Sequence, residues 1–536
     1  MSNNDRVFVY DCTLRDGTQG EQISLSVDDK LRIAEKLDAN GIHYIEGGWP
    51  GSNRKDVEFF ERAKSRSWVN SKIVAFGSTR HHKNSADQDP NLTALLEAET
   101  PAITVVGKSW DFHVEKALKT TLEENLKMVE DSVTFLKEHD KEVIFDAEHF
   151  FDGYAANPKY AKAVLRAARD AGADWVVLCD TNGGNLPFSL GPLVQQLSPE
   201  FPHLGIHTHN DCGVGVANSL AAIEAGACMV QGTINGYGER CGNANLCSIV
   251  PILELKLGKN TIGKDHLTGL TSLARFVSEM ANMALPNNLP FVGKSAFAHK
   301  GGLHVSGINK DSKTYEHLDP NDVGNARRVL ISDLSGKSSL VYKIKEFGDL
   351  ELEDIDIEGA LTHIKALEYE GYQFEGAEGT LRLLLYYFGR THKKPFTVAS
   401  FQILIDQNQS DQFTSKASVK VMVGDVEENV VSEGTGPVHA LDQAIKKALV
   451  RFFPEIDEIN LVDYKVRVLD VLHGTAAKVR VLIESCDKNE SWNTIGVSHN
   501  VIEASWKAIV DSVLYKLIFT SPQLNSEDPA STKVEK

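Results

Sequence analysis

The sequence predicts an α/β protein that begins with a (β/α)8 barrel, continues through a mainly helical region and ends in a smaller, internally duplicated α+β domain. Three observations carry this prediction. The chain has 536 residues, which is too long for one ordinary domain. Its first half repeats one strand–helix rhythm. A different pattern, with alternating apolar and polar residues, begins near residue 395.

Eight short runs with high β propensity mark the expected barrel strands, roughly 25–40 residues apart. They are residues 7–10, 42–45, 73–76, 103–106, 143–145, 175–178, 205–208 and 229–233. Eight strand–helix alternations fit a closed TIM barrel better than an open doubly wound sheet, which stays the alternative. No Gly-x-Gly-x-x-Gly follows the first run, and this disfavours a dinucleotide-binding sheet.

Capping residues indicate where two of the barrel helices begin. Thr121 and Glu124 form a capping-box pattern at the start of one helix. Ser26 and Asp29 begin another, which Asn40-Gly41 would end. The first of these helices carries an apolar stripe at steps of four and three: Leu122, Leu126, Val129, Val133 and Leu136.

The rest of the chain divides by composition. We expect the barrel over residues 1–270, a helical linker over 271–392, an α+β domain over 393–520 and a disordered polar tail over 521–536. The linker includes a polar, Gly-rich stretch at 299–307.

The third part shows an internal duplication. Residues 416–423 and 478–484 alternate apolar and polar side chains, as half-buried strands do. Each run precedes a long helical segment, 438–453 and 501–517 respectively. The pattern therefore predicts two copies of a strand–strand–helix unit.

Composition limits the classes of function. Lys and Arg number 56 against 74 Asp and Glu, a net charge of −18, so a nucleic-acid partner is not expected. We see no signal peptide and no apolar run of about 18 residues, so no membrane association is expected. Seven cysteines in so long a chain make no disulfide framework. Reduced thiols fit a cytoplasmic protein.

Metal-binding residue types stand where barrel strands end, at the edge that carries chemistry in such barrels. Arg15 and Asp16 follow the first strand, although a surface ion pair would explain them equally well. His207 and His209 lie two apart at the seventh strand and so face one side, as a pair of metal ligands would. Asn243 follows the eighth strand in a Gly-rich loop. A zinc site on the nearby cysteines is disfavoured, because no second Cys pair follows.

Two further residues are candidates because of their position at strand ends. Glu46 ends the second strand, at the expected substrate site, where it would hold Arg15 or a water. Arg80 follows the third strand and could contact a substrate carboxylate or a CoA phosphate.

Three motifs occur in order: Asp-x-Thr-Leu-Arg-Asp-Gly at 11–17, His-x-His-Asn-Asp at 207–211 and Gly-Glu-Arg-x-Gly-Asn at 238–243. With them, the chain resembles the family of 2-isopropylmalate, homocitrate and citramalate synthases over nearly its whole length. These are metal-dependent TIM barrels that condense acetyl-CoA with a 2-oxo acid. The resemblance also implies a helical linker and a duplicated regulatory domain.

The resemblance implies a role for each matching residue. A divalent cation (Zn, Mn, Co or Mg) would be held by Asp16, His207, His209 and Asn243. Arg15 would stabilise the oxyanion, Thr181 would bind the substrate carboxylate and Glu148 would act as acid/base. His304 and Tyr315, from the linker, would complete the site. The family commonly has Asp where this chain has Ser306, so the handling of the acyl-CoA could differ in detail.

Segments 44–50, 107–111 and 179–184 are similar to bacterial, citramalate-forming members of the family. This implies condensation of pyruvate with acetyl-CoA and water to (R)-citramalate and CoA, in isoleucine biosynthesis. The alternatives are 2-oxoisovalerate or 2-oxoglutarate as substrate, retro-aldol cleavage on the same barrel, or a barrel that binds without catalysis. The third domain would bind isoleucine as effector, or serve only to join a homodimer.

Overall fold

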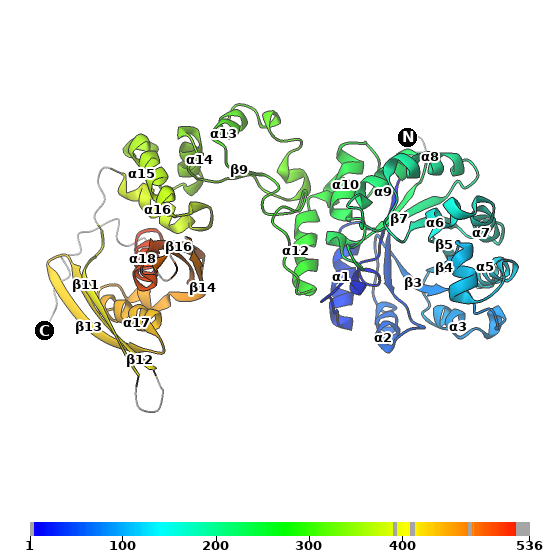
Figure 1. Ribbon diagram of the computed structural model, residues 1–536, viewed down its shortest axis with the longest axis horizontal. Coiled ribbons are helices and arrows are strands. Elements are labelled where there is room, and N and C mark those ends of the chain that lie inside the picture. The colour runs from blue at the N-terminus through cyan, green and yellow to red at the C-terminus, as the bar shows by residue number, and fades with distance from the viewer. Residues whose placement is uncertain (1–4, 390–393, 408–412, 470–473, 475, 521–536) are drawn as a thin grey trace. The chain divides into compact units, whose positions relative to one another are not determined.

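The computed structural model describes residues 5–389, 394–407, 413–469, 474 and 476–520 (Figure 1). The described residues form two compact units. The first runs through Phe297 and includes Leu318–Arg327, and the second contains Ala298–His317 and continues from Arg328. The tail that we predict to be disordered, 521–536, lies outside the described residues.

The first unit contains the predicted barrel. Eight parallel strands close in sequence order, and β1 pairs with β8 through Phe8↔Met229 and Val9↔Val230. The strands are β1 (Phe8–Asp11), β2 (Tyr44–Gly48), β3 (Lys72–Ser78), β4 (Ala102–Lys108), β5 (Glu142–Glu148), β6 (Trp175–Asp180), β7 (Leu204–Thr208) and β8 (Met229–Gly232). The closed order confirms the TIM barrel and excludes the open sheet.

Helices cover the outside of the barrel. They are α1 (Val27–Ala39), α2 (Arg54–Ala63), α3 (Pro90–Glu97), α4 (Asp111–His113), α5 (Leu122–Glu138), α6 (Phe150–Ala156), α7 (Pro158–Asp170), α8 (Pro187–Leu197), α9 (Gly215–Glu224), α10 (Leu246–Leu255), α11 (Lys264–Leu267) and α12 (Leu270–Met280). Both predicted helix starts are present. Ser26 and Asp29 form a reciprocal capping box, while Thr121 caps α5 by accepting from the backbone N–H of Glu124.

Both faces of the barrel strands are buried, which explains why they read as continuous apolar runs. Outward-facing side chains such as Val9 and Ile45 join the layer between strands and helices. Inward-facing ones form a separate interior layer with Tyr10, Tyr44 and Val177. This interior packing leaves the strand ends to carry polar side chains.

The second unit begins with a helical part. It comprises β9 (Ala298–His299), α13 (Gly302–Ile308), β10 (Arg328–Val329), α14 (Lys337–Phe347), α15 (Ile357–Glu370) and α16 (Glu378–Tyr387). The Gly-rich stretch at 299–307 therefore lies mostly in a short helix.

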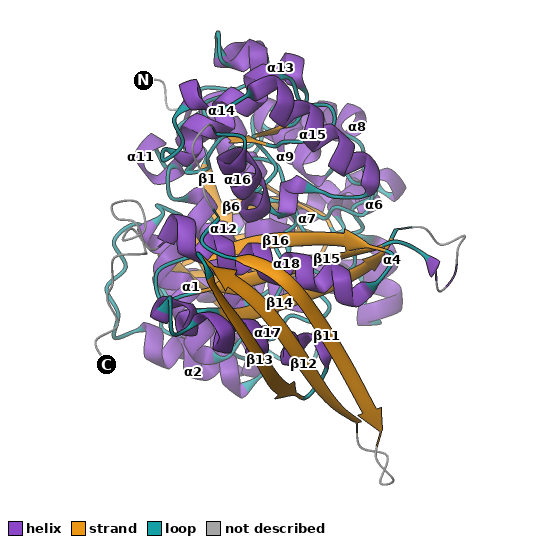
Figure 2. Cartoon of the chain, turned by 90° about the vertical axis from the view of Figure 1, so that its left-hand side faces the viewer, coloured by secondary structure: helices purple, strands orange, loops and turns teal. Residues whose placement is uncertain are grey.

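Two similar subdomains follow, each with three antiparallel strands and one helix (Figure 2). The first has β11 (Thr397–Gln407), β12 (Phe413–Val423), β13 (Val426–Gly434) and α17 (Pro437–Leu449). The second has β14 (Asn460–Val468), β15 (Val479–Cys486), β16 (Ser491–Ser498) and α18 (Val501–Tyr515). The duplication is confirmed, but the unit is strand–strand–strand–helix. Our prediction found only β12 and β15, the central strand of each sheet.

Among the described residues, no helix combines the length and the apolar character that crossing a bilayer requires.

Candidate active site

Asp16, His207 and His209 meet at the carboxyl ends of β1 and β7 inside the barrel. Their side chains are almost fully buried, with exposed fractions of 4%, 4% and 5%. One ligand atom from each residue lies within 4.8 Å of the others. His207 Nε2 is 3.5 Å and His209 Nε2 is 4.0 Å from Asp16 Oδ2. The cluster can therefore hold one metal ion.

Local backbone geometry places these three groups. His207 and His209 are two residues apart at the end of β7, so a pleated strand directs both side chains to one face. Asp16 follows β1 and begins the 3-10 turn Gly17–Gln19.

Asn243 reaches the same place from the loop after β8, where its backbone pairs with His209. Two glycines make this approach possible. A Cβ on Gly242 would lie 2.0 Å from the Gly236 carbonyl oxygen, and one on Gly238 would lie 2.2 Å from Asn243 Nδ2. Both also have positive φ, +86° and +155°. Only glycine therefore allows the loop to present Asn243.

The chemistry of the cluster fits a divalent cation. Among the described residues, two buried oxygens here have no hydrogen-bond partner, Asp16 Oδ1 and Asn243 Oδ1. Buried polar atoms without partners are costly, and one explanation is an ion that the site is built to bind. Carboxylate, imidazole and amide donors together suit Zn, Mn, Co or Mg.

The charge state of the cluster is also suitable. Burial favours the neutral acid, but the Arg15 guanidinium and the two imidazoles outweigh it and hold the pKa of Asp16 below its usual value. Burial, with His207 adjacent, lowers the pKa of His209 to about 4. At neutral pH the site therefore offers an ionised carboxylate and a neutral imidazole, the forms that ligate metals.

Arg15 stands beside the cluster. Its Nη1 is 3.4 Å from Asp16 Oδ2, and its Nε pairs with Glu46 Oε1. The guanidinium carbon lies 3.7 Å from the centre of the Phe76 ring. Glu46 is fully buried and its other oxygen accepts a 2.6 Å hydrogen bond from Tyr10 Oη. Glu46 therefore lies behind Arg15 and orients it.

Glu148 ends β5 and forms an ion pair with Lys108, which ends β4. The two residues are Cα partners in the β4–β5 register, so neighbouring strands place them together. Both side chains are partly exposed, 24% for Glu148 and 26% for Lys108. Lys108 was not among our predicted site residues, although it lies within a segment that carried the resemblance.

Thr181 follows β6 and is half-buried. Its Oγ1 accepts a 2.9 Å hydrogen bond from the backbone N–H of His149. Its carbonyl oxygen accepts a 2.7 Å hydrogen bond from Arg240, whose Nε and Nη2 also donate to the carboxylate of Asp211. The Thr181 hydroxyl hydrogen thus stays available at the barrel mouth.

Arg80 has a different environment from the one we predicted. Its side chain is buried, with Nε 2.9 Å from Asp131 Oδ2 and Nη2 2.8 Å from Glu124 Oε1. It therefore ties the loop after β3 to α5. This geometry does not favour a substrate contact, which stays a prediction.

His304 and Tyr315 belong to the second unit. Their rings stack with centroids 4.1 Å apart and planes at 22°. A Cβ on Gly307 would lie 2.6 Å from the Tyr315 ring, so glycine permits the stack. His304 is exposed and Tyr315 is 47% exposed, so both can meet a ligand.

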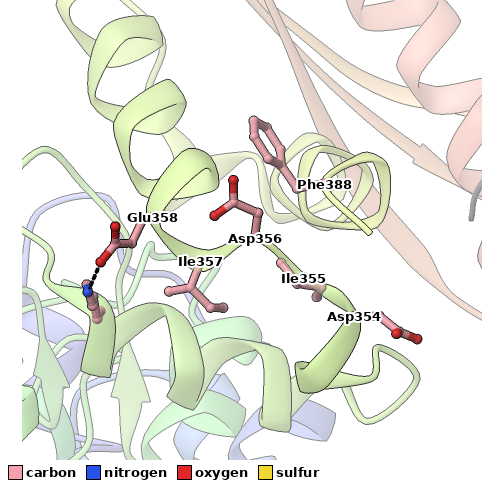
Figure 3. A pocket seen from close by; sticks show the side chains of 7 residues that line it. Asp354, Ile355, Asp356, Ile357, Glu358 and Phe388 are labelled. Carbon is pink, nitrogen blue, oxygen red and sulfur yellow. Dashed lines mark hydrogen bonds and ion pairs between the residues drawn. The ribbon is translucent and has the colours of Figure 1, made fainter. Parts of the chain in front are cut away.

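The second unit also has a cavity of about 430 Å³ beside the start of α15 (Figure 3). Two of its three acidic lining residues, Asp356 and Glu358, already have local partners. Asp356 caps α15 through the backbone N–H of Gly359, and Glu358 pairs with Lys337. This lining indicates no specific chemistry.

Our sequence prediction missed two buried polar residues, Gln231, which contacts His207, and Asp146, which contacts Gln231. Gln231 contacts His207 Nδ1 at 2.8 Å and Asp146 at 3.0 Å. Burial, with Glu46 nearby, raises the pKa of Asp146 to about 8. The position of Asp146 two residues before Glu148 was the available signal, because both face the same side of β5.

Comparison with known proteins agrees with this fold. Residues 6–277 match the HMGL-like family, and the site-bearing barrel lies in this range. Residues 291–371 match the homocitrate synthase post-HMGL domain-like family, and residues 375–517 match the LeuA allosteric (dimerisation) domain. The barrel with its buried Asp–His–His cluster is therefore of the HMGL-like class.

Full-length relatives define the chain further. It is 54% identical over 519 residues to the (R)-citramalate synthase of Aquifex aeolicus, covering 96% of this chain and 98% of the relative. It is 53% identical over 514 residues to that of Geobacter sulfurreducens, covering 95% and 97%. It is 47% identical over 540 residues to the (R)-citramalate synthase of Synechocystis, which covers 98% of this chain and 99% of the relative. The chain belongs to this family of (R)-citramalate synthases, which confirms the resemblance seen in its motifs.

Proposed function

We propose that the protein condenses pyruvate with acetyl-CoA and water to give (R)-citramalate and free CoA, in isoleucine biosynthesis. The observation that carries this proposal is the near full-length identity to five (R)-citramalate synthases, at 41–54%. The buried cluster at the barrel mouth supports a condensation at a 2-oxo acid. The alternatives are 2-isopropylmalate formation from 2-oxoisovalerate, or homocitrate formation.

Asp16, His207, His209 and Asn243 would hold the divalent cation, whether Zn, Mn, Co or Mg. When bound, it would supply Lewis-acid polarisation of the 2-oxo acid. Two buried oxygens that lack hydrogen-bond partners among the described residues, Asp16 Oδ1 and Asn243 Oδ1, support this assignment, because a cation would satisfy them.

Arg15 would stabilise the negative charge that develops on the keto oxygen. Its Nε is held by buried Glu46, so the guanidinium is oriented before substrate arrives. Thr181 would donate its hydroxyl hydrogen to the substrate carboxylate, because its oxygen already accepts from His149.

Glu148 would act as the acid/base group. The methyl hydrogens of an acetyl thioester are weakly acidic, so a positioned base is needed to remove one. The new bond joins that methyl carbon to the keto carbon of pyruvate. Water then cleaves the thioester, which yields the second carboxylate of citramalate and releases CoA. Lys108 would keep the Glu148 carboxylate directed into the mouth.

His304 and Tyr315 would complete the site from the linker, 271–392, which follows the catalytic barrel, 1–270. We assign residues 393–520 to a domain that binds isoleucine as effector and joins two copies of the chain. The match to the LeuA allosteric (dimerisation) domain supports this assignment. The enzyme would act in the cytoplasm.

Release of free CoA, measured with a panel of 2-oxo acids, tests the substrate. We expect kcat/KM for pyruvate to exceed that for 2-oxoisovalerate and 2-oxoglutarate. Preference for 2-oxoisovalerate would overturn the assignment to citramalate while keeping the reaction class. No CoA release with any 2-oxo acid would overturn both.

A further inference from the structure

A chain of three buried side chains runs behind the proposed metal site. It joins His207 on β7, Gln231 on β8 and Asp146 on β5. His207 Nδ1 is 2.8 Å from Gln231 Oε1, and Gln231 Nε2 donates to Asp146 Oδ1 at 3.0 Å. The exposed fractions are 4%, 0% and 3%, so solvent does not compete for these bonds.

The hydrogen bonds between these three side chains run in one direction. The Gln231 amide has one donor end and one acceptor end. Asp146 Oδ1 accepts from the donor end, either as a carboxylate oxygen or as the carbonyl oxygen of a neutral acid. The acceptor end therefore faces His207, and Nδ1 must carry the hydrogen. Nε2 then keeps its lone pair, and Nε2 is the atom that faces Asp16 Oδ2.

Packing alone does not explain these polar side chains. They lie beside an interior layer that is mainly apolar, with Ile144, Val177 and Met229. Burying an amide and a carboxyl group there costs free energy unless they are hydrogen-bonded, whereas an apolar residue would carry no such cost. His209 provides a contrast, because its Nδ1 has no partner among the described residues.

We propose that Gln231, oriented by Asp146, is a positioning residue that fixes His207 as the Nδ1–H tautomer and so prepares Nε2 to bind the metal. The inference rests on the proposed metal site and adds two residues to it. Groups that orient a ligating histidine typically change metal affinity by about 10–100-fold when removed.

The test measures the Zn²⁺ affinity of the full-length, metal-free protein by competition with a chromophoric chelator. Gln231→Met keeps the side-chain length but removes both hydrogen bonds, and we expect affinity to fall by about tenfold or more. Gln195→Met, at an exposed position on α8, is the matched control. Thermal unfolding of each metal-free variant reports on its folding.

A double variant, Asp146→Asn with Gln231→Glu, tests the donor–acceptor order of the hydrogen bonds that join these residues to His207. The new carboxylate at 231 can accept from Nδ1–H, and the new amide at 146 can donate to that carboxylate. We expect this variant to bind Zn²⁺ about as tightly as wild type. If Gln231→Met does not fold, the Zn²⁺ affinity of the double variant alone tests the proposed role of Gln231.

Each outcome has one meaning. Weak binding by Gln231→Met with retained binding by the double variant supports the proposal. Wild-type affinity in folded Gln231→Met, or loss of affinity in the folded double variant, overturns it while leaving the metal site in place. Unchanged affinity in His207→Ala would instead overturn the metal site itself, and this proposal with it.

Discussion

The two sides of the barrel mouth differ in burial. At the ends of β1 and β7, Asp16, His207 and His209 are at most 5% exposed. At the ends of β4 and β5, Lys108 and Glu148 are about a quarter exposed. We call these the buried side and the open side. A buried side suits a fixed ion, since electrostatic interactions are strong away from water. An open side suits a base that must meet a mobile acyl thioester and exchange its proton.

The difference predicts that substitutions on the buried side remove metal, whereas those on the open side slow turnover and leave metal binding intact. His207→Ala should have the largest effect. Losing the ion removes several kcal/mol of transition-state stabilisation, so we expect turnover to fall on the order of 10⁴-fold. Metal content, measured by elemental analysis, should fall with it.

His203→Ala is the control for that experiment, because His203 is exposed and lies before β7, at the opposite end of the barrel. It should retain both metal and activity. Full metal content in His207→Ala would show that the buried side does not hold the ion.

Glu148→Gln should have the next largest effect. It keeps the shape of the side chain but cannot accept the substrate proton, so we expect turnover to fall about 10²–10³-fold. Metal affinity should not change. Glu142→Gln, at the other end of β5, should turn over normally. Undiminished turnover in Glu148→Gln would remove Glu148 from the chemistry.

Lys108→Met tests whether the open side depends on its ion pair. A hydrogen bond between charged groups is worth about 1.5 kcal/mol or more, so we expect kcat to fall about tenfold as Glu148 loses its orientation. Lys108→Arg should recover much of the loss. If kcat is the same in all three proteins, the pair is only a surface contact.

The smallest expected effect concerns Asp11, at the end of β1, whose contribution to the free energy of unfolding depends on pH. Burial outweighs its hydrogen bonds to Thr13 and raises its pKa to about 7. Between its unfolded pKa of about 4 and about 7, the folded protein holds a proton that the unfolded chain has lost. The stability from this group is therefore complete below about pH 4, decreases as pH rises from about 4 to about 7, and is lost above the folded pKa.

Asp11→Asn should remove that dependence. We expect its free energy of unfolding at pH 8, measured with urea, to exceed that of wild type by on the order of 2 kcal/mol, with little difference at pH 4. Asp265→Asn, an exposed position on α11, should follow wild type at both values. A gain that is the same at both pH values would rule out the titration of Asp11 as its source.

Sequence predicted the barrel well because its strands are buried on both faces and stand out as apolar runs. The outer strands of the C-terminal sheets were missed for the converse reason. Most residues of β14 are exposed, so no alternation marks it. The outer strands are fixed by their pairing with β12 and β15, which depends on tertiary structure and not on a local sequence pattern.

The site residues also divide into those that a local motif reveals and those that only tertiary contacts reveal. Asp16, His207, His209 and Asn243 stand in motifs whose residue types indicate their chemistry. Lys108 and Gln231 contact site residues on other strands, and those contacts depend on strand register. The partners of the buried Arg80 side chain likewise come from a helix some forty to fifty residues further along the chain.

The most direct test of the proposed function measures CoA release from acetyl-CoA and pyruvate by the full-length protein. It is made after treatment with a chelator and again after Mn²⁺ is added back. We expect activity to disappear on chelation and to return with Mn²⁺ in wild type but not in His207→Ala. Undiminished CoA release by the chelated protein, with no bound metal detected, would contradict a metal-dependent condensation at this site.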